Sequence, residues 1–199
     1  LNAVRCSHYP QSKSFLERCD EIGLIVFEEA PGWQDIGNDT WKEVYIENVK
    51  EMISRDKNHP SIISWGVRVN ESYDDHDLYE KTNSIAREMD STRPTHGVRR
   101  LETYNDGECQ EDLFGANYTY PDFPRIRPFI VTEHSMDWWS GDGCPGATDS
   151  QACVFISSFG DAVNYYYGNK FCLGGFGWSM FDYNNEVNYT KTGHLFYSG

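Results

Sequence analysis

Seven short and mostly apolar runs recur along this chain, and most of them stop at polar or acidic residues. Helix-like patterns follow the first, second, third and sixth of these runs. Alternation of strand and helix is typical of a parallel α/β fold. The pattern therefore predicts strands at 1–5, at 24–27, within 58–72, and at 95–98, 113–117, 129–132 and 174–181.

Two α/β architectures fit this alternation, a (β/α)8 barrel and a doubly wound sheet. A doubly wound sheet usually carries a G-x-G-x-x-G turn, and no such motif opens a helix here. Seven strands are one fewer than the barrel requires, and a barrel cannot close with one strand missing. We therefore expect residues 1–199 to form one α/β domain, an incomplete (β/α)8 TIM barrel with strands 2 to 8 present and strand 1 upstream of Leu1.

The helices between the strands carry recognisable ends and faces. Ser12 is a plausible N-cap for the first helix, and Gly23 ends that helix. The second helix begins near Thr40 and has apolar residues at helical spacing. Its predicted buried face consists of Trp41, Val44, Tyr45, Val49, Met52 and Ile53.

Composition and charge narrow the classes of function. The net charge of −14 at pH 7 argues against nucleic acid and against anionic membrane surfaces as partners. No run approaches the roughly 20 apolar residues of a membrane span, and no basic-then-apolar signal segment is present. The sequence does not distinguish a cytoplasmic, a periplasmic and a secreted protein. The aromatic content of 15% suits both a packed core and a carbohydrate site, where flat rings stack on sugars.

The cysteines and histidines give little support to a metal or redox site. No C-x-x-C pair occurs, so the six cysteines are expected to be thiols, with a Cys144–Cys153 link as the alternative in an oxidising compartment. A metallohydrolase on the same barrel commonly has an H-x-H pair, which the six histidines do not form. The four N-x-[ST] matches, at Asn38, Asn70, Asn117 and Asn188, are interpreted as chance.

Four acidic residues stand at predicted strand ends: Glu28, Glu29, Glu71 and Glu133. Cleavage of a glycosidic bond needs two carboxyl groups, one to protonate the leaving oxygen and one to attack the anomeric carbon or activate water. Glu71 and Glu133 are 62 residues apart, which spans three strand steps of a barrel. Strands four and seven lie on facing sides of the mouth, so this pair is the predicted catalytic pair.

Several motifs resemble the catalytic barrel of glycoside hydrolase family 2, a family of β-galactosidases, β-glucuronidases and β-mannosidases. They occur in order at residues 2–10, 19–24, 58–72, 129–134 and 178–183. The resemblance covers nearly the whole chain and implies a retaining, exo-acting β-glycosidase without an organic cofactor. It also implies that β-sandwich domains precede the barrel. A role for a divalent cation and a homo-oligomeric parent enzyme are left open.

The resemblance assigns roles to three residues at the centre of the site. Asn70-Glu71 matches the Asn-Glu of the family, which makes Glu71 the general acid/base and Asn70 a partner of the sugar 2-hydroxyl. Glu133 matches the nucleophile. The run from Trp65 to Asn70 departs from the more usual Ser-Leu-Gly-Asn ending, in a manner associated with β-galactosidase-like members. The predicted substrate is a terminal β-galactoside, with a β-glucuronide or β-mannoside as the alternative.

Four further residues receive supporting roles from the same resemblance. Arg5 matches an arginine that keeps the nucleophile ionised, as a cation beside a carboxylate does. Tyr118 matches a tyrosine that hydrogen-bonds the nucleophile, and Trp178 matches an aromatic floor of the sugar subsite. His8 is expected to contact sugar hydroxyls. The plainer alternatives are a rim salt bridge for Arg5 and ordinary packing for Tyr118 and Trp178.

The remaining polar residues at strand ends have less definite roles. Glu28 is expected to serve the rim or contact a sugar hydroxyl, and so is Glu29. His134 would orient Glu133 or cap its strand. A barrel that binds sugar without cleaving it is the non-enzymatic alternative. Expressed alone, the 199 residues are expected to be poorly stable and inactive, because an open barrel leaves two strand edges unpaired.

Overall fold

The computed structural model describes residues 2–100, 109–118, 128–134, 138–139, 149–178, 183–184 and 197–198. It divides into two compact units. The first unit contains Leu1–Ala116 and Phe123–Phe129, and the second contains Asn117–Asp122 and Ile130–Gly199. The expectation of one domain over 1–199 stays a prediction.

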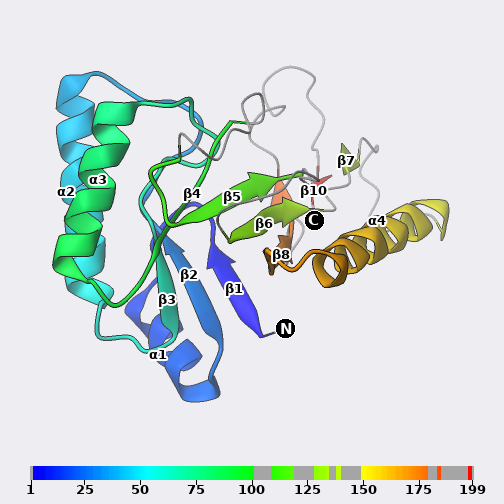
Figure 1. Ribbon diagram of the computed structural model, residues 1–199. Coiled ribbons are helices and arrows are strands. Elements are labelled where there is room, and N and C mark those ends of the chain that lie inside the picture. Colours follow the sequence, from blue (N-terminus) through cyan, green and yellow to red (C-terminus); the bar gives the residue numbers. More distant parts are fainter. Residues whose placement is uncertain are drawn as a thin grey trace. The chain divides into compact units, whose positions relative to one another are not determined.

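The first unit is built on parallel strands that pair in the order of the sequence (Figure 1). They are β1 (Ala3–Cys6), β2 (Ile25–Glu29), β3 (Ile62–Gly66), β4 (Thr95–Val98) and β5 (Leu113–Asn117). A doubly wound sheet reverses its strand order at a switch point, whereas a barrel continues in one direction. The unbroken order from β1 to β5 therefore favours the barrel, as the sequence predicted.

Three helices connect the first four strands, and the two ends predicted for the first helix are confirmed. Helix α1 (Lys13–Ile22) begins at Ser12, whose hydroxyl accepts a hydrogen bond from the Phe15 amide, and ends at Gly23 in the left-handed region. Helix α2 (Asp39–Asp56) is capped by Asn38, and α3 (His76–Met89) by Asp75. In Figure 1, α2 and α3 lie side by side.

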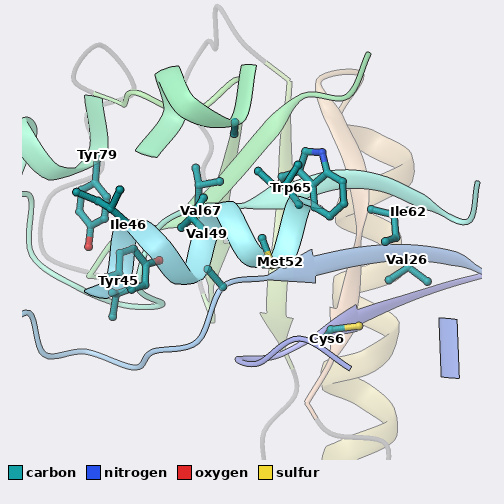
Figure 2. Packing of buried hydrophobic residues seen from close by; sticks show 14 of the residues in the cluster. Cys6, Val26, Tyr45, Ile46, Val49, Met52, Ile62, Trp65, Val67 and Tyr79 are labelled. Carbon is teal, nitrogen blue, oxygen red and sulfur yellow. The ribbon is translucent and has the colours of Figure 1, made fainter. Parts of the chain in front are cut away.

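The core of the first unit lies between its strands and helices. Figure 2 shows side chains of α2 converging with side chains of β2 and β3. Trp65 is the largest of these and is fully buried. The predicted buried face of α2 is confirmed at four positions but is wrong at Val44, which is 55% exposed, while Ile46 is buried instead. The four confirmed residues are Tyr45, Val49, Met52 and Ile53.

Strand β3 is shorter than the apolar run that predicted it. The ladder ends at Gly66, and beyond it isolated bridges join Asn70 to Trp33 and Ser72 to Arg99. Val67 and Val69 are fully buried although they lie outside the strand. Their burial explains why an apolar pattern alone extended the strand too far.

The second unit contains β6 (Phe129–His134), α4 (Asp149–Gly168) and β8 (Cys172–Gly177). The Trp178 amide donates to the His134 carbonyl at 2.9 Å, which places the ends of β6 and β8 next to each other. The short strands β7 (Trp138–Trp139), β10 (Tyr197–Ser198) and β9 (Tyr183–Asn184) form a small antiparallel sheet that the sequence did not predict. Residues 179–181 of the predicted last strand lie outside the described residues.

Two smaller predictions concern membranes and thiols. In the described part of the chain, no helix has the length and apolarity needed to cross a membrane. Cys6, Cys19, Cys109 and Cys172 carry thiols, as expected. Cys144 lies outside the described residues, so a link to Cys153 stays a prediction.

Candidate active site

The ends of β1 and β2 bring a buried arginine and a buried glutamate together. Arg5 donates from Nε to Glu29 Oε1 at 2.5 Å and from Nη2 to Glu29 Oε2 at 3.1 Å. Their side chains are 2% and 4% exposed. Two nearly parallel charge-assisted bonds of this kind fix the planes of both groups as well as their distance.

Two histidines and an asparagine complete the surroundings of this ion pair. His8 Nδ1 lies 3.4 Å from Glu29 Oε2, and His96 Nε2 lies 3.3 Å from Glu29 Oε1. Asn70 accepts a hydrogen bond from Arg5 Nη2 at 2.8 Å, and its Nδ2 lies 3.3 Å from His8 Nε2. The first unit therefore brings together the predicted site residues Arg5, His8 and Asn70 around Glu29.

The charge of Glu29 is set by these neighbours. Burial acts to raise its pKa, but the Arg5 guanidinium and the hydrogen bonds of His8 and His96 outweigh burial. The pKa of Glu29 is therefore held well below its usual value. The group is an ionised carboxylate in a buried, hydrogen-bonded setting.

A glycine makes room for this arrangement. A Cβ atom on Gly66 would lie 2.5 Å from Glu29 Cγ and 2.9 Å from His96 Nε2. Any side chain at this position would displace both groups. The last residue of β3 is therefore fixed as glycine by packing against the buried carboxylate.

Glu28 lies on the other face of β2, because successive side chains of a strand point in opposite directions. It is fully buried, accepts a hydrogen bond from the Gln11 amide at 3.3 Å, and lies 3.6 Å from Arg55 of α2. Burial and the nearby charge of Asp56 raise its pKa to about 8. The structure does not bring Glu28 into the group around Glu29, and the sugar contact expected of Glu28 stays a prediction.

Glu71 stands in the segment that follows β3 and is half-buried. Its φ of 55° is in the left-handed region, which costs a residue other than glycine on the order of 1–3 kcal/mol. Its Oε2 accepts hydrogen bonds from Trp33 Nε1 at 3.1 Å and from Gln34 Nε2 at 3.2 Å. The Glu71 amide donates to the Val98 carbonyl at 3.0 Å. The carboxylate is thus oriented by two side-chain donors while part of it faces solvent.

Glu133 lies in β6 of the second unit and is only 4% exposed. Tyr118 Oη donates to Glu133 Oε2 at 2.8 Å, and the Tyr118 amide donates to the Glu133 carbonyl at 2.7 Å. Tyr118 has a φ of 52°, again in the left-handed region. The contact that the sequence predicted between these two residues is present, and their roles in a reaction stay predictions.

The neighbours of Glu133 on β6 and β8 have separate surroundings. His134 points toward α4, where its ring meets those of Phe159 at 4.9 Å and Tyr166 at 5.6 Å. Burial lowers the pKa of His134 to about 4, which favours the neutral ring. The backbone of Trp178 bonds to His134, and the sugar-floor role of its side chain stays a prediction.

The predicted catalytic carboxylates belong to different units, and so do Arg5 and Glu133. The expectation that Arg5 keeps Glu133 ionised therefore stays a prediction. No group of three or more His, Cys, Asp or Glu side chains in the described ranges could hold a metal ion. The question of a divalent cation stays as open as the sequence left it.

The sequence did not predict that His96, Trp33 and Gln34 contact carboxylates of the site. It also did not predict that Glu29 lies at the centre of the contacts of Arg5 and His8. A histidine inside the short run 95–98 was a usable signal, since a polar residue in a buried strand needs a partner. Trp33 and Gln34 lie in an irregular segment, and their contact with Glu71 depends on the bridge between Trp33 and Asn70. No local pattern in the sequence predicts that bridge.

Comparison with known proteins gives one match to a family model and many to individual proteins. The model described as "Glycosyl hydrolases family 2, TIM barrel domain" matches residues 1–145. A β-galactosidase of Thermoanaerobacter pseudethanolicus is 45% identical over 213 residues, which cover 100% of this chain and 27% of that protein. A putative β-glucuronidase of Formosa agariphila is 34% identical over 129 residues, which cover 58% of this chain and 15% of that protein.

The solved structures agree in fold. The crystal structure of a GH2 β-galacturonidase from Eisenbergiella tayi bound to galacturonate superposes with a TM-score of 0.78 at 22% identity, over 95% of this chain and 39% of that one. Together with the family model, this likeness confirms the predicted fold, part of a (β/α)8 barrel. The chain spans less than a third of the length of the β-galactosidase it matches.

Proposed function

Since the chain belongs to glycosyl hydrolase family 2, as part of its TIM barrel domain, we propose that the complete protein is a retaining β-glycosidase acting on terminal β-galactosides. The observation that carries the proposal is the hydrogen bond from Tyr118 to Glu133, which restrains a buried carboxylate in the way a nucleophile requires. The bonds of Trp33 and Gln34 to Glu71 support a second, more accessible carboxyl group.

The proposed reaction proceeds in two displacements. In the first, Glu133 attacks the anomeric carbon while Glu71 gives its proton to the glycosidic oxygen, which leaves as an alcohol. The product is a glycosyl ester of Glu133. In the second, Glu71 takes a proton from water as the water oxygen attacks the same carbon and releases Glu133. Two inversions give net retention, and the reaction needs no organic cofactor.

Galactose is the proposed sugar because the β-galactosidase relative is similar over the whole of this chain. The β-glucuronidase relative covers 58% of it, which makes a uronic acid the second candidate. A screen of the complete natural polypeptide against 4-nitrophenyl β-galactoside, β-glucuronide, β-galacturonide and β-mannoside separates these candidates. Turnover that is fastest on the β-galactoside is expected; sugar binding without turnover of any of the four would contradict the proposal.

The assignment of the two carboxyl groups predicts different responses to their removal. Glu71→Ala and Glu133→Ala are each expected to reduce turnover by about 10²-fold or more, since general acid–base catalysis alone contributes about 10²–10⁴-fold. Added azide should partly restore Glu71→Ala by forming a β-glycosyl azide, because azide needs no general base. The exposed Glu21 of α1 provides the control Glu21→Gln, and wild-type turnover in Glu71→Ala or Glu133→Ala would refute the assignment.

A further inference from the structure

A cluster of four charged side chains lies in the first unit, close in sequence to Glu71; three of them are buried, and the side chain of Asp74 is 21% exposed. Its members are Arg68, Asp74, Arg99 and Glu111, and this set is called the charge cluster below. Arg68 donates from Nε to Glu111 Oε1 at 2.9 Å and from Nη2 to Asp74 Oδ1 at 3.0 Å. Arg99 donates to both carboxylate oxygens of Asp74.

The cluster encloses the segment that carries Glu71. Arg68 precedes Glu71 by three residues and Asp74 follows it by three, so the Arg68–Asp74 contact closes a loop with Glu71 at its centre. Arg99 directly follows β4 and Glu111 precedes β5, which ties this loop to the two neighbouring strands. The side chains of Arg68, Arg99 and Glu111 are each 1% exposed or less.

Packing around the cluster leaves little freedom for Arg68. Its guanidinium carbon lies 3.9 Å from the centre of the Tyr79 ring. A Cβ atom on Gly97 would lie 2.7 Å from Arg68 Cβ and 2.9 Å from Glu111 Oε1. A glycine in β4 is therefore required where the arginine crosses the strand.

The residue directly after Glu71, Ser72, is held by residues that adjoin the cluster. The Arg100 amide donates to the Ser72 carbonyl at 3.0 Å, and Ser72 Oγ lies 2.5 Å from Tyr79 Oη. Buried ion pairs are weak evidence for stability, because apolar residues of similar volume often stabilise a fold at least as well. Their better-attested use is to select one conformation. Here the selected conformation is that of a loop whose central residue has the unfavourable φ of 55°.

We propose that Asp74 and Arg68 are positioning residues for Glu71, acting through the charge cluster to hold its carboxyl group where a leaving-group oxygen is protonated. The proposal rests on the proposed function, because it needs Glu71 to be the general acid/base. The proposal also gives a role to Arg68. This residue lies between Trp65 and Asn70, where the sequence departs from the usual Ser-Leu-Gly-Asn pattern of the family.

The experiment uses the complete natural polypeptide and the variant Asp74→Asn, with Asp77→Asn as control. Asp77 is an exposed acid three residues further on and lies outside the cluster. Two aryl β-galactosides are compared. The 2,4-dinitrophenolate group of the first leaves without being protonated, whereas the phenolate group of the second needs a proton from a general acid. Asp74→Asn is expected to lower kcat/KM on the phenyl substrate by about 10–100-fold, since a misplacement of about 1 Å can cost 10²-fold. On the dinitrophenyl substrate the expected loss is less than about threefold, because no general acid is needed for that step.

Equal losses on the two substrates would overturn the positioning role, since a general loss of folded protein affects both alike. If Asp74→Asn does not fold, Arg99→Lys, which keeps the charge but loses the fork-shaped donor set, is measured in the same way and must show the same difference between substrates. Glu71→Ala is measured alongside. If Glu71→Ala loses kcat/KM equally on the phenyl and the dinitrophenyl substrate, the proposed function itself is refuted. If Glu71→Ala loses more on the phenyl substrate, as expected, but Asp74→Asn loses equally on both, only the positioning role is refuted.

Discussion

The two faces of strand β2 carry adjacent carboxyl groups in opposite electrostatic settings. Glu29 faces Arg5, His8 and His96, and its pKa is held well below the usual value. Glu28 faces α2, where burial and the charge of Asp56 raise its pKa to about 8. Both side chains are buried: that of Glu29 is 4% exposed and that of Glu28 is 0% exposed. Burial acts to raise the pKa of both groups, and only on the face of Glu29 do the partners outweigh it.

The difference teaches which face can support chemistry. The face of Glu29 carries a fixed charge pair with two histidines and the Asn70 amide, a set of polar groups able to orient a polyhydroxylated ligand. The face of Glu28 packs against a helix and holds a carboxyl group that is neutral over much of the physiological pH range. The face of Glu29 is therefore suited to binding a ligand, whereas the face of Glu28 is part of the packing between β2 and α2.

The largest expected effect is the difference in stability between Glu29→Gln and Glu28→Gln, the same substitution made on the two faces of β2. Glu29→Gln removes the negative charge that Arg5 contacts through two nitrogens, and breaking a buried ion pair typically costs about 3–5 kcal/mol. Glu28→Gln at pH 6 removes no charge, because Glu28 with a pKa of about 8 is already protonated there. Urea denaturation of both variants at pH 6 measures the difference. Equal destabilisation by the two substitutions would mean that Glu28 and Glu29 do not differ in charge in the folded protein.

A glycine on the neighbouring strand gives a second, smaller effect. Gly66→Ala places a methyl group 2.5 Å from Glu29 Cγ and 3.0 Å from the Glu28 carbonyl oxygen. The expected destabilisation is about 1–3 kcal/mol, as for other overpacked interiors. Gly160→Ala is the control, because a Cβ there meets nothing within 4 Å and α4 gains a better helix former.

Both Gly66→Ala and its control are measured by the midpoint of denaturation. Gly66→Ala should also reduce turnover, since Glu29 and His96 would both have to move. A Gly66→Ala variant as stable and active as Gly160→Ala would show that the face of Glu29 adapts without cost. That result would remove the packing argument for a rigid site.

The sequence was sufficient for the order of the parallel strands and their helices but not for the faces of β2. Apolar runs and helix caps such as Ser12 are local features, so they predicted these elements, although not the short antiparallel strands β7, β9 and β10. Both faces of a barrel strand are buried, and period-two alternation alone does not say which face is inward. Glu28 and Glu29 therefore had the same expected role, and the sequence did not predict that Arg5 would contact Glu29.

The contacts of the candidate site depend on residues far apart in the chain. The partners of Glu29 come from β1, its following loop and β4, up to 67 residues away. Trp33 reaches Glu71 across 38 residues through an irregular segment that carries no periodic signal. The Tyr118–Glu133 contact was predictable because the resemblance supplied it, and neither residue's own neighbourhood would have.

The smallest expected effect tests the comparison through pH. The pKa of Glu28 is about 8 in the folded protein and about 4.3 in an unfolded chain. Between these values the folded state holds a proton that the unfolded state has lost, so the free energy of unfolding falls as pH rises through this window. Glu28→Gln cannot ionise and should flatten this decline, so the stability of the variant relative to the wild type is expected to increase steadily as pH rises toward 8. Glu29 has the opposite shift, so its contribution is complete above pH 4.3 or so and is lost only in acid. Urea denaturation at pH 5, 6, 7 and 8 measures the Glu28 slope, and a further series below about pH 4 measures the loss of the Glu29 contribution. Parallel profiles for wild type and Glu28→Gln between pH 5 and 8 would show that Glu28 does not take up a proton on folding.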